Sequence, residues 1–182
     1  MEPLIKYGHN HFGENKVQEA NAKWSELKKT NTNLKLHMVG RLQTNKAKKA
    51  VSLFDFIHSL DSQNLADKLK KSEEELNKKL QYFVQVNIGD EKQKSGILLK
   101  ETKSFTQYCM NEAKLNVIGL MVIPPDNENT SKYFQEISSL NSNLRFKELS
   151  MGMSNDYLEA IKFNSTFIRI GTAILGERTL DK

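Results

Sequence analysis

The chain has 182 residues, a length typical of one domain and sufficient to bury a hydrophobic core. Its net charge of +5 comes from lysines spread along the chain, which argues against a dedicated nucleic-acid-binding segment. The single cysteine, Cys109, excludes an internal disulfide framework, and no segment reads as a membrane span or a signal peptide.

Short apolar runs alternate along the chain with segments of helical periodicity. The first segment, residues 2–8, is typical of the end of a helix closed by Gly8. Strands are expected at residues 11–13, 34–39, 53–59, 80–88, 115–123, 146–151 and 166–175. Helices are expected at residues 17–29, 64–79, 99–114, 131–141 and 155–163, with Asp61 or Ser62 as the N-cap of the second.

Polar or small residues follow each predicted strand at its C-terminal end. In a β/α barrel all such ends meet on one face, whereas in a doubly wound sheet only those near the switch point do. The pattern therefore predicts the α/β class and a (β/α)8 TIM-barrel type, as one domain over residues 1–182. Only seven strands are found and the chain opens inside a helix, so we expect an N-terminally truncated barrel whose first strand is missing.

The last two predicted strands end in small residues, which let backbone N–H groups approach a phosphate closely. The loops after the last two barrel strands are also the usual phosphate position. The alternative is that Ser154 caps a helix and the glycines serve tight turns. Arg169 lies in an apolar strand, where a cation needs a partner. That partner is a ligand or, alternatively, Glu14 or Asp61.

Seven motifs appear in order along the chain: FGENKVQEA at 12–20, HMVGRLQTNK at 37–46, DFIHSLDS at 55–62, KSG at 94–96, GLM at 119–121, LSMGMS at 149–154 and RIGTAILG at 169–176. Together they resemble the YggS/PROSC family of pyridoxal 5′-phosphate (PLP) homeostasis proteins. The resemblance implies an alanine racemase N-terminal-domain-like barrel, PLP as cofactor, and a carrier or regulator of vitamin B6 and amino-acid balance rather than an enzyme.

The resemblance also implies cofactor-binding residues. It assigns the phosphate to Ser150, Ser154, Gly171 and Thr172, and the pyridine nitrogen to Arg169. A guanidinium only donates hydrogen bonds, so it would hold that nitrogen unprotonated and weaken the ring as an electron sink.

Two further residues, Asn15 and His37, are assigned to the cofactor by the resemblance. A helix-cap role for Asn15 and a hydrogen-bonded core role for His37 stand as alternatives. Asn45 and Lys46 are interpreted as a solvated loop. No catalytic residue is predicted. No metal site is predicted either, because the histidines and Cys109 show no metal-ligand spacing.

The family's Schiff-base lysine would precede residue 1, and Lys6 is not its equivalent because it lies in the following helix. Covalent lysine attachment is therefore not expected for this chain. We expect binding through phosphate and ring contacts, and two unpaired strand edges that invite mispairing. One hypothesis is that an upstream segment was lost, or that the start was assigned too far downstream.

Three functions remain open from the sequence. The first is a cytoplasmic, monomeric PLP carrier whose partners are the cofactor and PLP-dependent apoenzymes, with no nucleic acid or membrane. The second is a racemase-like PLP enzyme. The third is a degenerate remnant that no longer binds PLP.

Overall fold

The computed structural model describes residues 1–91, 93–125 and 130–176. The strands are β1 (His11–Glu14), β2 (Lys35–Met38), β3 (Phe56–Leu60), β4 (Gln81–Asn87), β5 (Ile97–Leu98), β6 (Val117–Val122), β7 (Glu148–Met153) and β8 (Phe167–Arg169). The helices are α1 (Glu2–Lys6), α2 (Val17–Thr30), α3 (Ala47–Leu53), α4 (Gln63–Leu76), α5 (Thr102–Asn111), α6 (Thr130–Asn143), α7 (Tyr157–Lys162) and α8 (Thr172–Leu175). Short 3-10 turns, η1 (Thr44–Lys46) and η2 (Leu99–Glu101), precede α3 and α5.

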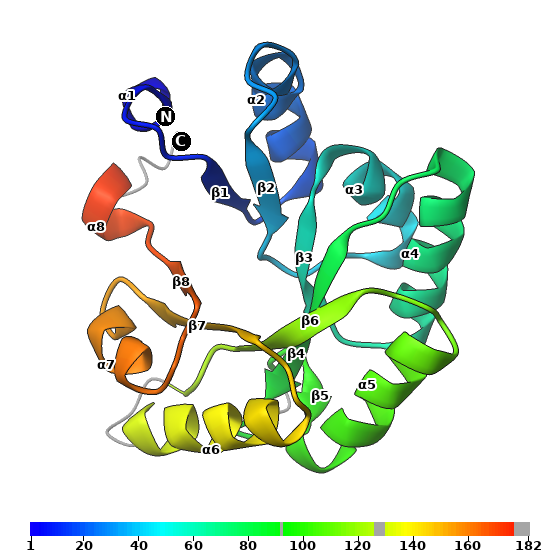
Figure 1. The fold of residues 1–182 in the computed structure, drawn as a ribbon, viewed down its shortest axis with the longest axis vertical. Coiled ribbons are helices and arrows are strands. Elements are labelled where there is room, and N and C mark those ends of the chain that lie inside the picture. Colours follow the sequence, from blue (N-terminus) through cyan, green and yellow to red (C-terminus); the bar gives the residue numbers. More distant parts are fainter. Residues whose placement is uncertain (92, 126–129, 177–182) are drawn as a thin grey trace.

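The strands form one parallel sheet in the order β1-β2-β3-β4-β6-β7-β8, and the short β5 pairs with β4 off this path. Figure 1 shows the sheet curved into an incomplete barrel with the helices around its outer side. β1 and β8 end the sheet, and in the described part of the chain no ladder joins them. The expectation of a seven-stranded barrel of the (β/α)8 type is confirmed, and β5 is an additional strand.

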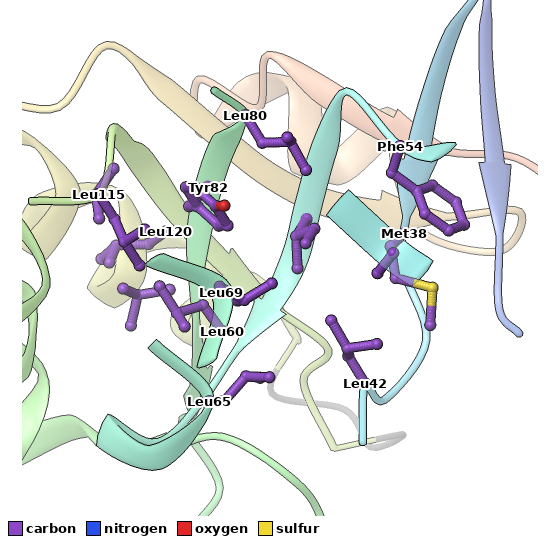
Figure 2. Packing of buried hydrophobic residues seen from close by; sticks show 14 of the residues in the cluster. Met38, Leu42, Phe54, Leu60, Leu65, Leu69, Leu80, Tyr82, Leu115 and Leu120 are labelled. Atoms are coloured by element: carbon purple, nitrogen blue, oxygen red, sulfur yellow. The ribbon is translucent and has the colours of Figure 1, made fainter. Parts of the chain in front are cut away.

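The main hydrophobic core lies between the outer face of the sheet and the helices. Trp24, Leu69 and Phe134, from α2, α4 and α6, are completely buried in it. Figure 2 shows leucines of α4 packed beside the strands of this layer. Inside the curved sheet a smaller cluster joins Phe56, Phe83 and Met121. The inner strands β3, β4 and β6 are thus covered on both faces, as their apolar sequences predict, whereas the end strands β1 and β8 keep exposed residues.

Side-chain hydrogen bonds fix two of the helices. The Ser62 hydroxyl accepts from the Leu65 N–H and caps α4, as predicted, while Asn77 ends this helix in the left-handed conformation. In α2 the only tryptophan of the chain, Trp24, donates from Nε1 to Glu14 Oε1 at 2.6 Å. Lys23 Nζ lies 2.9 Å from the same oxygen. These contacts attach the end strand β1 to α2.

Most predicted bounds differ from the observed ones by a few residues, and three of the differences have a clear local cause. Residues 47–53 form α3, so the strand expected over 53–59 begins only at Phe56. The strand expected over 166–175 ends at Arg169, because residues 172–175 form the helical turn α8. The helix expected at 155–163 begins at Tyr157, since Asp156 Oδ1 accepts from Met153 N–H and holds residues 153–156 in a turn. Over the described ranges, no helix is long and apolar enough to cross a membrane.

Candidate cofactor site

The carboxyl ends of β7 and β8 bring together three of the predicted phosphate ligands. Ser154 Oγ lies 3.4 Å from the Gly171 backbone nitrogen and 3.2 Å from Thr172 Oγ1. A Cβ placed on Gly171 would meet no atom within 4 Å, so open space lies beside this backbone. Two hydroxyls and an N–H at one exposed point are suitable donors for phosphate oxygens. We call Ser154, Gly171 and Thr172 the phosphate cradle.

Ser154 does not cap a helix, so that part of the alternative is wrong: the N-cap of α7 is Asp156. Gly152 permits the turn before α7. Its φ of +92° is unfavourable for other residues, and a Cβ there would lie 2.7 Å from the Ala160 Cβ. Glycine at 152 therefore allows α7 to pack closely against β7 and sets the position of Ser154.

Arg169 ends β8 with its guanidinium turned into the barrel. Nη1 donates to Ser150 Oγ at 2.8 Å and Nη2 to the Val122 carbonyl at 2.9 Å. Burial lowers the pKa of Arg169 to about 10, opposed by nearby Asp156, so the guanidinium is still charged at neutral pH. Two of its five donors are used in these contacts, which leaves donors for a ligand.

The predicted alternative of an ion pair between Arg169 and Glu14 or Asp61 is wrong. Within the described ranges no carboxylate forms an ion pair with Arg169, and Glu14 binds Lys23 and Trp24 instead. Burial raises the pKa of Asp61, although the nearby Arg41 counteracts the effect.

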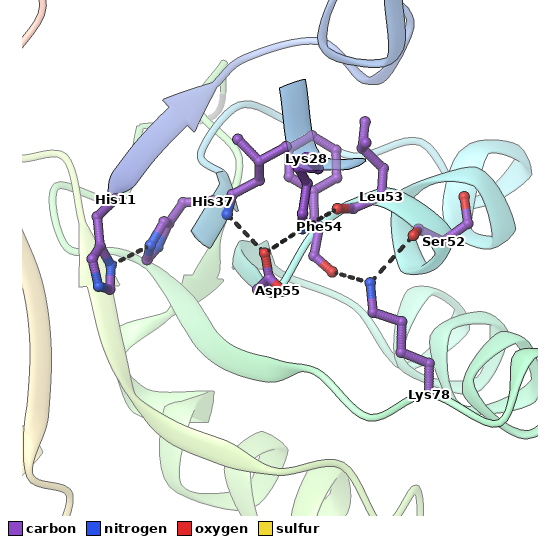
Figure 3. A network of polar contacts seen from close by, with 9 residues as sticks. His11, Lys28, His37, Ser52, Leu53, Phe54, Asp55 and Lys78 are labelled. Atoms are coloured by element: carbon purple, nitrogen blue, oxygen red, sulfur yellow. Dashed lines mark hydrogen bonds and ion pairs between the residues drawn. The ribbon is translucent and has the colours of Figure 1, made fainter. Parts of the chain in front are cut away.

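Ser150, the fourth predicted phosphate ligand, has no hydrogen bond to the phosphate cradle among the described contacts and accepts one from Arg169 instead. It is completely buried, and its hydroxyl also lies 2.8 Å from His58 Nδ1. His58 Nε2 is 2.9 Å from His37 Nδ1, and His37 Nε2 is 2.9 Å from His11 Nδ1. Figure 3 shows the last of these contacts, between β1 and β2. The structure thus joins Ser150, Arg169 and His37 through His58, a residue for which the sequence predicted no role.

The two inner histidines are packed as aromatic residues. His37 stacks on Phe56 with centroids 4.2 Å apart, and His58 stacks on Phe83 at 4.3 Å. Burial, followed by the neighbouring His11, lowers the pKa of His37 to about 3. Burial also holds the pKa of His58 well below its usual range, with His37 and Arg169 acting in the same direction. Both imidazoles are therefore neutral at pH 7.

Asn15, which follows β1, lies at the other end of the strand order from Arg169. Its backbone carbonyl would be 2.3 Å from a Cβ on Gly40, so these two loops are in close contact. Asn15 lines two cavities, of about 800 and 250 Å³. Asn45 and Lys46 line only the larger one. In the described ranges no group of three or more histidine, cysteine, aspartate or glutamate side chains is arranged so that it could hold a metal ion.

Known proteins match this chain over nearly its whole length. The family model of the alanine racemase N-terminal domain matches residues 1–179. The pyridoxal phosphate homeostasis protein of Aquifex aeolicus is 39% identical over 176 residues, covering 92% of this chain and 76% of that protein. The corresponding protein of Haemophilus influenzae is 35% identical over 181 residues, covering 94% and 76%.

A solved structure shows the same architecture. PipY of Synechococcus elongatus, determined with PLP bound, is 34% identical with a TM-score of 0.87, and the match covers 96% of this chain and 85% of that one.

Proposed function

Because the chain belongs to the alanine racemase N-terminal domain family, together with relatives named pyridoxal phosphate homeostasis proteins, we propose that it binds PLP and serves in its homeostasis. The observation that carries this proposal is the convergence of the phosphate cradle with Arg169 at the ends of β7 and β8. The cradle suits the phosphate, and the free donors of Arg169 suit the pyridine nitrogen.

Arg169 also favours a carrier over a catalyst. PLP, when bound to an enzyme, supplies an electron-withdrawing ring whose strength depends on protonation of its nitrogen. A guanidinium donates and cannot accept, so Arg169 would hold that nitrogen unprotonated. Amino-acid racemase activity is the alternative, and it is tested with several amino acids; measurable PLP-dependent racemisation would contradict the carrier role.

The proposed site is tested by PLP titration followed by absorbance. Arg169→Ala is expected to weaken binding by roughly tenfold or more, the effect of losing a hydrogen bond from a charged donor. Lys46→Ala is the matched control, because this variant also loses one cation. Lys46 itself lines the larger cavity beside β1 and β2. Equal losses in the two variants would contradict the site. No binding by the wild-type chain would favour the remnant instead.

Non-covalent binding is tested by borohydride reduction of the loaded protein followed by mass spectrometry. We expect no PLP adduct, and an adduct would identify a lysine that this proposal omits. A carrier also needs recipients, here PLP-dependent apoenzymes in the cytoplasm. Transfer from the loaded monomer should reactivate such an apoenzyme faster than the same free PLP concentration does.

A further inference from the structure

The barrel interior contains a continuous line of polar contacts that extends beyond the contacts proposed for PLP. It runs from Arg169 to Ser150, then to His58, His37 and His11, with successive distances of 2.8, 2.8, 2.9 and 2.9 Å. We call these five residues the histidine relay. Its members come from β8, β7, β3, β2 and β1, so the line crosses the interior and ends at β1.

The chemistry of Arg169 fixes the direction of these hydrogen bonds. A guanidinium can only donate, so Ser150 Oγ accepts from it and needs an acceptor for its own hydrogen. Among the described contacts of Ser150 Oγ, the other partner is His58 Nδ1. Ser150 therefore donates to His58 Nδ1, and His58 carries its hydrogen on Nε2.

The same reasoning sets the other two rings. His58 Nε2–H donates to His37 Nδ1, so His37 carries its hydrogen on Nε2 and donates to His11 Nδ1. In the reverse direction Ser150 would accept from both neighbours, and its buried hydroxyl hydrogen would have no acceptor among its described contacts. Only the direction from Arg169 to His11 satisfies every inner donor.

The environment of His37 and His58 favours this order of hydrogen bonds. A neutral imidazole donates from one nitrogen and accepts at the other, whereas a charged one only donates and would interrupt the line. The buried, stacked positions of His37 and His58 favour the neutral form. Stacking on Phe56 and Phe83 also restricts the tilt of each ring.

We propose that His58 and His37 are positioning residues, which hold their hydrogens on Nε2 and act through Ser150 to hold the Arg169 guanidinium in its place beside the cofactor site. The hydrogen-bond order stands on the geometry of this chain alone. Its effect on PLP rests on the proposed function. Among the described contacts, the relay leaves the Nε2–H of His11, at the β1 end of the open sheet, without an acceptor.

The hydrogen-bond order is tested by ring 15N NMR on protein containing 15N-histidine, at pH 7.5 and without PLP. We expect His37 and His58 to show only the Nε2–H tautomer. Ser150→Ala removes the donor at the start of the line and should convert both rings to averaged tautomers. Ser165→Ala is the matched control, because Ser165 joins β7 and β8 without touching the relay. A wild-type Nδ1–H tautomer at either ring would overturn the order.

The positioning role is tested with His58→Phe, which keeps an aromatic ring against Phe83 but removes the link to Ser150. PLP affinity should fall by roughly three- to tenfold, the equivalent of one hydrogen bond. Unchanged affinity in a folded variant would overturn the role even if the tautomers are as expected. If His58→Phe does not fold, His37→Phe tests the same link through the tautomer of His58. Failure of the wild-type chain to bind PLP refutes the proposed function, while the tautomers still test the relay.

Discussion

The two faces of the curved sheet are stabilised by different physical means. The face toward the helices buries aliphatic and aromatic side chains, such as Leu69 and Phe134, whose burial does not depend on pH. The inner face combines Phe56 and Phe83 with His37 and His58, which must stay neutral to keep their hydrogen bonds. The outer layer therefore supplies stability, whereas the inner layer supplies orientation and makes the fold sensitive to acid.

The largest expected effect tests the outer layer. Phe134→Ala removes a completely buried ring between α6 and the sheet, and should lower the free energy of unfolding by about 3–5 kcal/mol. Urea denaturation measures the loss. Leu158→Ala, at a side chain that is 65% exposed, should cost well under 1 kcal/mol and is the control. Similar losses in both variants would show that the outer layer does not supply most of the stability.

The next largest effect is the pH dependence of stability, which tests the inner layer. His37 titrates near its ordinary pKa of 6.5 when unfolded but at about 3 when folded. Between these values the unfolded chain binds more protons, so stability is retained above pH 6.5 and lost as pH falls toward 3. At pH 5 the loss from His37 alone is about 2 kcal/mol. Thermal unfolding between pH 8 and 5 measures it.

The same experiment distinguishes the contribution of His58 to the pH dependence from that of the outer layer. His58 shifts in the same direction, so His58→Phe should make the melting temperature depend less steeply on pH. Phe134→Ala should lower the melting temperature at every pH without changing that slope. A melting temperature that is flat from pH 8 to 5 in the wild-type chain would contradict neutral histidines in the barrel.

The smallest effect is confined to one helix end of the outer layer. Ser62→Ala removes the hydroxyl that caps α4 and should cost about 1 kcal/mol, without altering the 15N shifts of the inner histidines. Ser139→Ala, at an exposed serine within α6, should be close to neutral. Shifts that change with Ser62→Ala would show that the two faces are coupled.

The order of strands could be predicted from the sequence because each apolar run is short and ends at polar residues. The proximity of Ser154 to Gly171 and Thr172 could also be predicted, since these small residues lie near the ends of the last two strands, although the last one was expected to continue to residue 175. Helix α3 was missed because it has only seven residues and its last one, Leu53, was included in the strand expected over 53–59. The length of the last strand was overestimated because Ile174 and Leu175 are apolar but exposed, on α8.

The histidine relay could not be found from sequence spacing. Its contacts join residues that are 26, 21, 92 and 19 positions apart, and no local motif encodes such distances. The parallel register brings them together: His37 lies opposite Phe56, two residues before His58 on the same face of β3. A histidine within a wholly buried strand, as at 58, was the one available signal.

The bond between Trp24 and Glu14 gives the molecule an internal optical probe. Trp24 is the only tryptophan and is completely enclosed, while Glu14 belongs to the end strand β1. Indole emission shifts to longer wavelength when water reaches the ring. Any detachment of β1 from α2 would expose this ring, so the emission colour reports whether the first strand of the open sheet is in place.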